Sequence, residues 1–276
     1  MAETDMTTLL AIVALLAVAG GITGVLAGLF GVGGGTITVP LLYEVFGLIG
    51  VDDGVRMPLS VGTSLAIIIP TSILSARGHY ARGAVDMVLV RAWAVPVVAG
   101  VICGAVLARW ASAGVFQAVF VVVALANVVK LGFGRDSWRI ADAMPDGWVL
   151  RCYGAVMGVM SALMGIGGGA ISNLVLTLHG RPIRQSIATS SAIGVLIAIP
   201  GAAGYIWAGW GRDGLPPWSL GFVSLLAFVL LVPTTLLTTR IGVRLAHSLP
   251  KRRLEVLFAC FLALVSLRFV AALAGY

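Results

Sequence analysis

Two glycine clusters have the most unusual spacing in the sequence, with four glycines in five positions followed by small polar residues. Glycine costs about 1 kcal/mol relative to alanine in a helix interior, so each cluster predicts a helix break. The N–H groups that begin the returning arm of a broken helix can bind an anion. The candidate binding residues are Gly31, Gly33, Gly34, Gly35, Thr36 and Thr38 in the first copy, and Gly165, Gly167, Gly168, Gly169, Ser172 and Asn173 in the second.

Hydroxyl side chains also recur in two sets. Within each set the spacing is i, i+3 and i+4, which places the three side chains on one face of a helix. Hydroxyls can donate to an oxyanion without adding charge, which suits an anion that must be held and then released. Alternatively, they bond the carbonyls of their own helices or lie at helix contacts. The candidates are Ser60, Thr63 and Ser64, and Ser186, Thr189 and Ser190.

Catalytic and cofactor chemistry find little support. Gly31 and Gly33 have no preceding strand and no Gly-Lys-Ser/Thr ending, so a nucleotide loop is excluded. The sequence has no HExxH zinc motif, serine elbow or paired intramembrane aspartate. We therefore predict no enzyme activity, no cofactor and no metal. His79 and His179 are expected in solvent at the edges of loops.

Composition defines the setting of these residues. Of 276 residues, 59% are hydrophobic and only 11% are charged, which excludes a soluble globular enzyme. The basic residues are scattered between apolar runs rather than gathered on one face, so no nucleic-acid partner is expected. At about 20 residues per crossing, the chain can form roughly eight to ten membrane helices, and the lipid bilayer is its first predicted partner.

Apolar runs between charge and turn clusters predict an all-α, polytopic membrane protein. Two of the segments are too short to span comfortably, and both follow a glycine cluster, so we interpret them as arms of broken or re-entrant helices. The segments are Thr8–Phe30, Ile37–Gly50, Pro58–Ala76, Val85–Ala108, Val115–Leu131, Trp148–Met164, Ile171–Leu178, Ile187–Trp207, Trp218–Thr238 and Leu254–Ala274.

Arginine and lysine predict the orientation of the segments. Thirteen lie in the alternate connections 77–84, 130–151, 181–185 and 240–253, whereas the opposite set carries only Arg56, Arg109 and Arg212. Because short basic loops stay in the cytoplasm, both chain ends are predicted outside. This assignment requires each glycine-broken pair to enter and leave on the same side.

An internal repeat agrees with this topology. The segment 24–42 aligns with 158–176 at an offset of 134, Ser60-x-x-Thr63-Ser64 aligns with the second hydroxyl set at 126, and 104–108 aligns with 242–246. Two repeats, 1–140 and 141–276, would then form one membrane domain. Five segments in each make the second repeat inverted relative to the first.

The sequence resembles the sulfite exporter TauE/SafE family, also described as toluene-sulfonate uptake permeases. The resemblance rests on GLFGVGGGTITVPLL at 28–42 with VGTS at 61–64, and on the second copies ALMGIGGGAI at 162–171 and ATS at 188–190. It implies carriers of small sulfur-containing anions such as sulfite, sulfoacetate and other organosulfonates, in bacterial inner membranes. Pro40 departs from the repeat because Leu174 occupies the matching position.

We therefore hypothesise an exporter in which both breaks meet near the bilayer midplane and bind the anion by alternating access. One alternative is a carrier of another solute, such as a carboxylate or a cation. A cation would require buried acids, and only Glu44 is a candidate. The other alternative is a non-transporting membrane partner whose glycines only pack helices. The sequence indicates no oligomeric state.

Overall fold

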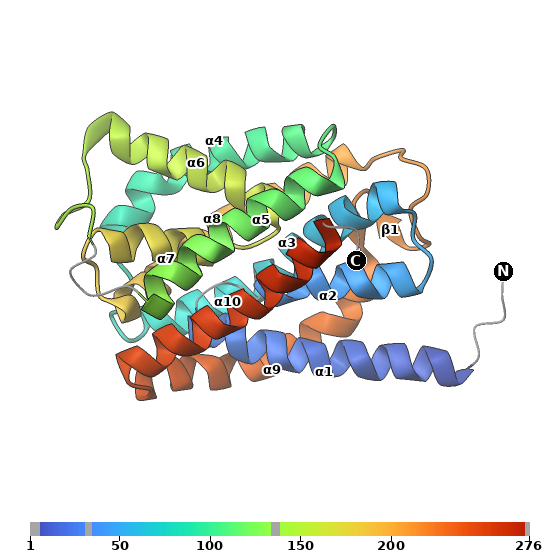
Figure 1. The fold of residues 1–276 in the computed structure, drawn as a ribbon, viewed down its shortest axis with the longest axis horizontal. Helices are drawn as coiled ribbons and strands as arrows, with labels where there is room; N and C mark the ends of the chain where they lie inside the picture. The colour runs from blue at the N-terminus through green and yellow to red at the C-terminus, as the bar shows by residue number, and fades with distance from the viewer. Residues whose placement is uncertain (1–5, 31–34, 134–138, 274–276) are drawn as a thin grey trace.

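The fold is a bundle of helices (Figure 1). The computed structural model describes residues 6–30, 35–133 and 139–273. Within these ranges the helices are α1 (Met6–Phe30), α2 (Gly35–Leu48), α3 (Asp53–Tyr80), α4 (Met87–Ala108), α5 (Ala113–Val128), α6 (Gly147–Met164), α7 (Gly169–Leu178), α8 (Ile183–Ala208), α9 (Leu225–Ser248) and α10 (Lys251–Leu273). A π-helical turn at Val129–Phe133 extends α5, and β1 (Ser219–Leu220) pairs with β2 (Val223–Ser224). The all-α prediction is confirmed.

Five helices of the described residues are long and apolar enough to cross a membrane: α3, α4, α6, α8 and α9. By contrast, α2 has 14 residues and α7 has 10, well below the roughly 20 that a crossing requires. Exposed tryptophans mark one end of the bundle. Trp110 follows the end of α4, and Trp207 lies in the last turn of α8. Trp148 and Tyr80 lie exposed at the other end. Two aromatic levels of this kind are typical of the membrane–water interfaces.

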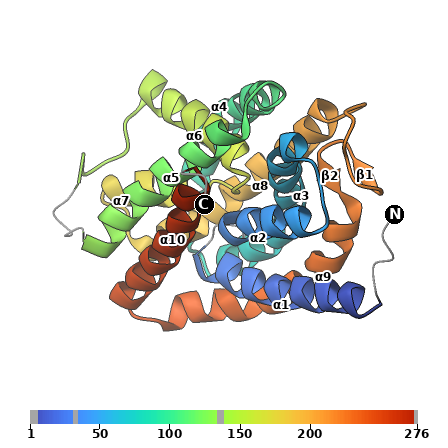
Figure 2. The ribbon, with the colours of Figure 1, turned by 45° about the vertical axis from the view of Figure 1, so that its right-hand side comes forward.

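The helices pair in a regular way. In Figures 1 and 2, α1 runs beside α9 along one side of the bundle, and α4 runs beside α6 along the other. Helices α3 and α8 pack against each other between these pairs, and α5 packs against α10. Phe120 and Phe269 close the α5–α10 contact edge to face, with ring centroids 4.7 Å apart. The buried interior therefore centres on α3 and α8, which carry most of the predicted hydroxyls.

One predicted boundary is wrong. The segment expected to start at Trp218 begins as a two-stranded hairpin, and α9 starts only at Leu225 and continues to Ser248. Trp218 has φ 62° and Gly221 has φ 55°, both left-handed conformations that a helix cannot contain. Ser224 then caps α9, its hydroxyl accepting from the Ala227 N–H at 3.3 Å.

Candidate functional site

The second glycine cluster breaks its helix as predicted. Helix α6 ends at Met164 and is capped by Gly165 with φ 65°, and α7 begins after Gly168 with φ 71°. Both backbones lie in the left-handed region, which glycine adopts without steric cost. The N–H of Ser172 donates to the Gly168 carbonyl at 2.7 Å, which starts the hydrogen-bond ladder of α7. The earlier N–H groups of this helix have no partner within it.

The first cluster can be followed only in part. Gly31, Gly33 and Gly34 lie outside the described residues, whereas Gly35 is buried and begins α2. Thr36 and Thr38, in the first turn of α2, are also buried. The chain therefore places the short helix α2 directly after the cluster, as α7 follows the second one.

The start of the first short arm lies against the second glycine cluster. A side chain on Gly35 would collide with the Gly165 carbonyl and would come within 2.8 Å of Ile166 Cα. The hydroxyl of Ser64, near the middle of α3, donates to the same Gly165 carbonyl at 2.8 Å. The start of α2 therefore lies against the end of α6, and only glycine at position 35 permits so close an approach.

Three buried hydroxyls around the second break have no hydrogen-bond partner within the part of the chain that the structure describes. They belong to Ser161 on α6, Ser172 on α7 and Ser72 on α3, each at most 1% exposed. A Cβ atom added to Gly168 would lie 3.5 Å from the Ser161 Oγ and 3.4 Å from the Ser172 Oγ. Leaving a buried hydroxyl unpaired costs about 1–3 kcal/mol. Unpaired groups gathered at one place therefore make this break the candidate binding site.

Ser72 reaches the same break from the facing helices. A Cβ atom added to Gly194 on α8 would lie 2.8 Å from the Ser72 Oγ and 3.0 Å from the Gly167 carbonyl oxygen. Ser72 and Ser161 were absent from the predicted site. Ser72 lies eight residues after Ser64, on the same face of α3. A longer reading of that face would have included it.

The predicted hydroxyls differ in what they bond. Ser60 and Ser186 donate to carbonyls of their own helices, Arg56 at 2.7 Å and Pro182 at 3.1 Å, as the alternative interpretation anticipated. Ser190 donates to Asn173 Oδ1 at 2.9 Å and so links α8 to the arm α7. Thr63 and Thr189 accept from backbone N–H groups at the starts of α9 and α4.

Charge is kept away from this interior. The buried side chains of the described residues include no carboxylate, guanidinium or ammonium group. Glu44, the candidate acid, is exposed. A buried site without charge but with hydroxyls and the N-terminal end of α7 offers mainly hydrogen-bond donors and a positive dipole end.

The prediction that His79 and His179 lie in solvent is wrong. His79 is 1% exposed and His179 is 3% exposed, although both border loops. His79 Nδ1 lies 3.0 Å from His247 Nε2, and His179 Nδ1 donates to the Val175 carbonyl at 2.8 Å. His79 thus contacts a residue of another helix, and His179 bonds a carbonyl of the preceding helix. The positions of these residues next to loops in the sequence do not indicate such contacts.

These features define a polytopic α-helical membrane transporter with short, glycine-started arms inside the bundle. A model of the family described as sulfite exporter TauE/SafE matches residues 16–269, and the chain belongs to this family. A probable membrane transporter protein of Haemophilus influenzae is 34% identical over 252 residues, covering 90% of this chain and 94% of the relative. One of Methanocaldococcus jannaschii is 25% identical over 261 residues, covering 92% and 93%. No solved structure matches the chain significantly.

Proposed function

We propose that the protein carries small sulfur-containing anions, such as sulfite, sulfoacetate or other organosulfonates, across the membrane by alternating access. The anion binds at the second break, against the N-terminal end of α7. The observation that carries this proposal is the convergence of three unpartnered, buried hydroxyls on the break, from Ser72, Ser161 and Ser172. The description of the family as sulfite exporters supplies the substrate class.

The chemistry of the site favours an anion over a cation. Hydroxyls and backbone N–H groups can donate to the three oxygens of a sulfonate or sulfite group, and the α7 dipole adds a positive end. A cation would instead require carboxylates or several free carbonyls, and the Gly165 carbonyl already accepts from Ser64. Export of one negative charge gains about 2.3 kcal/mol per 100 mV, so it can proceed without a coupling ion.

Alternating access rests on our further proposal that the halves 1–140 and 141–276 are inverted repeats. Their packing supports it. A side chain on Gly24 would collide with the Thr235 carbonyl, and one on Gly158 would collide with the Val97 carbonyl. Gly158 follows Gly24 by 134 residues and Thr235 follows Val97 by 138, which are offsets of the internal repeat. The α1–α9 and α4–α6 contacts are thus the same contact made twice.

Uptake into proteoliposomes tests the site. Ser72→Ala, Ser161→Ala and Ser172→Ala each remove a hydroxyl that has no partner among the described residues, so folding stability is expected to stay within about 0.5 kcal/mol. Each lost contact to the anion is expected to lower the transport rate at limiting substrate about tenfold. Ser266→Ala is the matched control, because the buried Ser266 hydroxyl bonds only the Leu262 carbonyl of its own helix.

Two results would overturn the proposal. The first is a triple serine variant that transports sulfite and sulfoacetate like the unmodified protein, which would exclude the site. The second is a folded, unmodified protein that moves none of sulfite, sulfoacetate and taurine, which would exclude the substrate class.

A further inference from the structure

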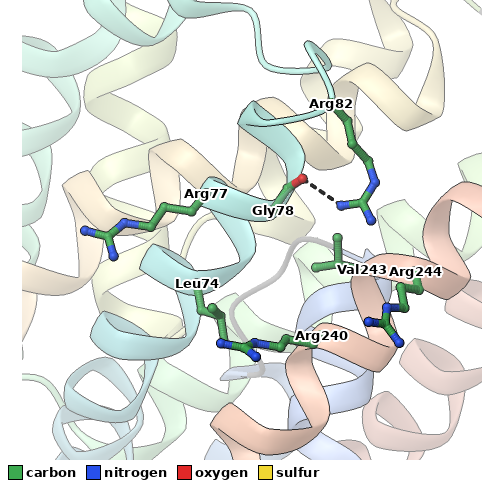
Figure 3. A pocket seen from close by; sticks show the side chains of 7 residues that line it. All are labelled: Leu74, Arg77, Gly78, Arg82, Arg240, Val243 and Arg244. Carbon is green, nitrogen blue, oxygen red and sulfur yellow. Dashed lines mark hydrogen bonds between the residues drawn. The ribbon is translucent and has the colours of Figure 1, made fainter.

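A second polar site lies at one end of the bundle, away from the helix breaks. A pocket of about 340 Å³ opens between the last turns of α3, the loop after it and the facing turns of α9 (Figure 3). Four of its seven lining residues are arginines. The lining consists of Leu74, Arg77, Gly78, Arg82, Arg240, Val243 and Arg244.

The charges of this pocket have no counterpart in its walls. No carboxylate of the described residues lines it. Elsewhere in the described part of the chain, four arginines each have a carboxylate within 4 Å, in the pairs Arg56–Asp53, Arg139–Asp142, Arg181–Asp86 and Arg252–Glu255. Four like charges around one cavity repel one another, so the pocket is stabilised when an anion enters.

Three of the arginines approach the pocket from two elements, α9 and the loop after α3. Arg240 and Arg244 are four residues apart on α9, which puts them on one face of that helix. Arg82 approaches from the loop, and its guanidinium donates to the Gly78 carbonyl at 2.7 Å, which restricts its position (Figure 3). Arg77 extends away from Arg82 in this view and forms the edge of the pocket.

We propose that this pocket binds a compact oxyanion group, a sulfonate, sulfite or phosphate, through Arg82, Arg240 and Arg244. Guanidinium groups present a planar fork of donors that matches two oxygens of such a group at once. The proposal does not depend on which solute the protein transports. Two sources carry this chemistry: a soluble anion, or the phosphate of an anionic lipid at the same membrane face.

Binding to delipidated protein in detergent tests the soluble source. Sulfate, sulfite and inorganic phosphate are titrated against chloride at constant ionic strength, with the melting temperature and calorimetry as readouts. A ligand that binds the folded protein raises its melting temperature. We expect Arg82→Gln, Arg240→Gln and Arg244→Gln each to weaken oxyanion binding about tenfold.

Two further variants separate the pocket from general charge. Arg151→Gln removes the same charge from an exposed position on α6 outside the pocket, and oxyanion affinity is expected to be unchanged. Arg240→Lys keeps the charge but loses the fork, so it is expected to weaken binding less than Arg240→Gln.

Native mass spectrometry of protein taken from vesicles of phosphatidylglycerol and phosphatidylcholine tests the lipid source. Retained phosphatidylglycerol that falls in Arg240→Gln and is displaced by sulfate would identify the lipid phosphate as the occupant. Unchanged lipid retention, with arginine-dependent sulfate binding, would identify a soluble anion. The proposal is wrong if neither sulfate nor phosphatidylglycerol binding changes in the three glutamine variants. Because the readout is binding, the proposal for the arginine pocket can be disproved while sulfite transport through the site of Ser72, Ser161 and Ser172 still holds.

Discussion

Thr63 on α3 accepts a hydrogen bond from the backbone N–H of Ser224 at 2.9 Å. Thr189 on α8 accepts in the same way from Asp86 at 3.0 Å. Ser224 and Asp86 are the residues that cap α9 and α4, and each caps by accepting from the N–H three residues later. The two threonines thus tie the central helices to the starts of two membrane-crossing helices, one at each end of the bundle.

This relationship predicts a stability role for both threonines. Thr63→Val and Thr189→Val keep the shape of the side chain but leave a buried N–H of Ser224 and a partly buried N–H of Asp86 without their acceptors, so each is expected to cost about 1–3 kcal/mol of unfolding free energy, the first more than the second. Thr239→Val is the control, because Thr239 bonds only the Thr235 carbonyl of its own helix. Thermal and denaturant unfolding in detergent measure the difference. Equal losses in all three variants would argue against the anchoring role.

The close contact of α1 with α9 predicts contrasting effects of two neighbouring glycines. Gly24→Ala would push a methyl group into the Thr235 backbone, and overpacking of this kind costs about 1–3 kcal/mol. Gly21→Ala would meet only Thr238 Cγ2 at 3.9 Å, an ordinary contact, and gains helix propensity. Melting temperatures should therefore fall for Gly24→Ala and stay the same or rise for Gly21→Ala. A fall in both would contradict the packing described.

Gly168→Ala is expected to destabilise the protein for two separate reasons. Its φ of 71° is unfavourable for alanine by about 1–2 kcal/mol, and its Cβ would collide with Ile197 Cδ1. Gly50→Ala isolates the first reason, because Gly50 has φ 77° and no atom within 4 Å of its Cβ position. We expect Gly168→Ala to lose more unfolding free energy than Gly50→Ala, and equal losses would exclude the contact with Ile197. This glycine variant therefore reports on folding, and the serine variants are the better test of transport.

The predicted orientation can be tested with single cysteines. Cys103, Cys152 and Cys260 are exposed and are first replaced by alanine. In that background Ser112→Cys, between α4 and α5, should react with an impermeant maleimide in intact cells. Ser248→Cys, at the end of α9 within the basic connection, should react only after permeabilisation. The reverse pattern would overturn the inside assignment of the basic loops.

The helices were largely predictable because hydrophobic runs of membrane length have few alternative structures. Each of the ten predicted segments overlaps one of the observed helices, and the short arms followed the glycine clusters. The start of α9 was misplaced because Trp218 adopts a positive φ, which its residue type does not signal. Apolar composition alone does not distinguish such a hairpin from the start of a helix.

The candidate site was less predictable because its members come from different helices. Glycines and paired hydroxyls indicated the second break, yet Ser72 joins it only through the packing of α3 on α8. The same reason hid the pairing of His79 with His247, which lie 168 residues apart. The pocket arginines contributed to the predicted orientation of the loops. They come together in one pocket only because α3 and α9 face each other in the fold. Contacts between distant segments were not encoded in any local pattern that we used.

The contact between Gly35 and the Gly165 carbonyl joins the start of the arm α2 to the end of α6, directly before the second helix break. Because any larger residue at position 35 would displace the Gly165 backbone, α2 cannot tilt toward α6 here without moving that helix end. Under the alternating access that we propose, movement of the first arm is therefore expected to move the second break. Coupled movement of this kind would keep the two sides of the site from opening at the same time.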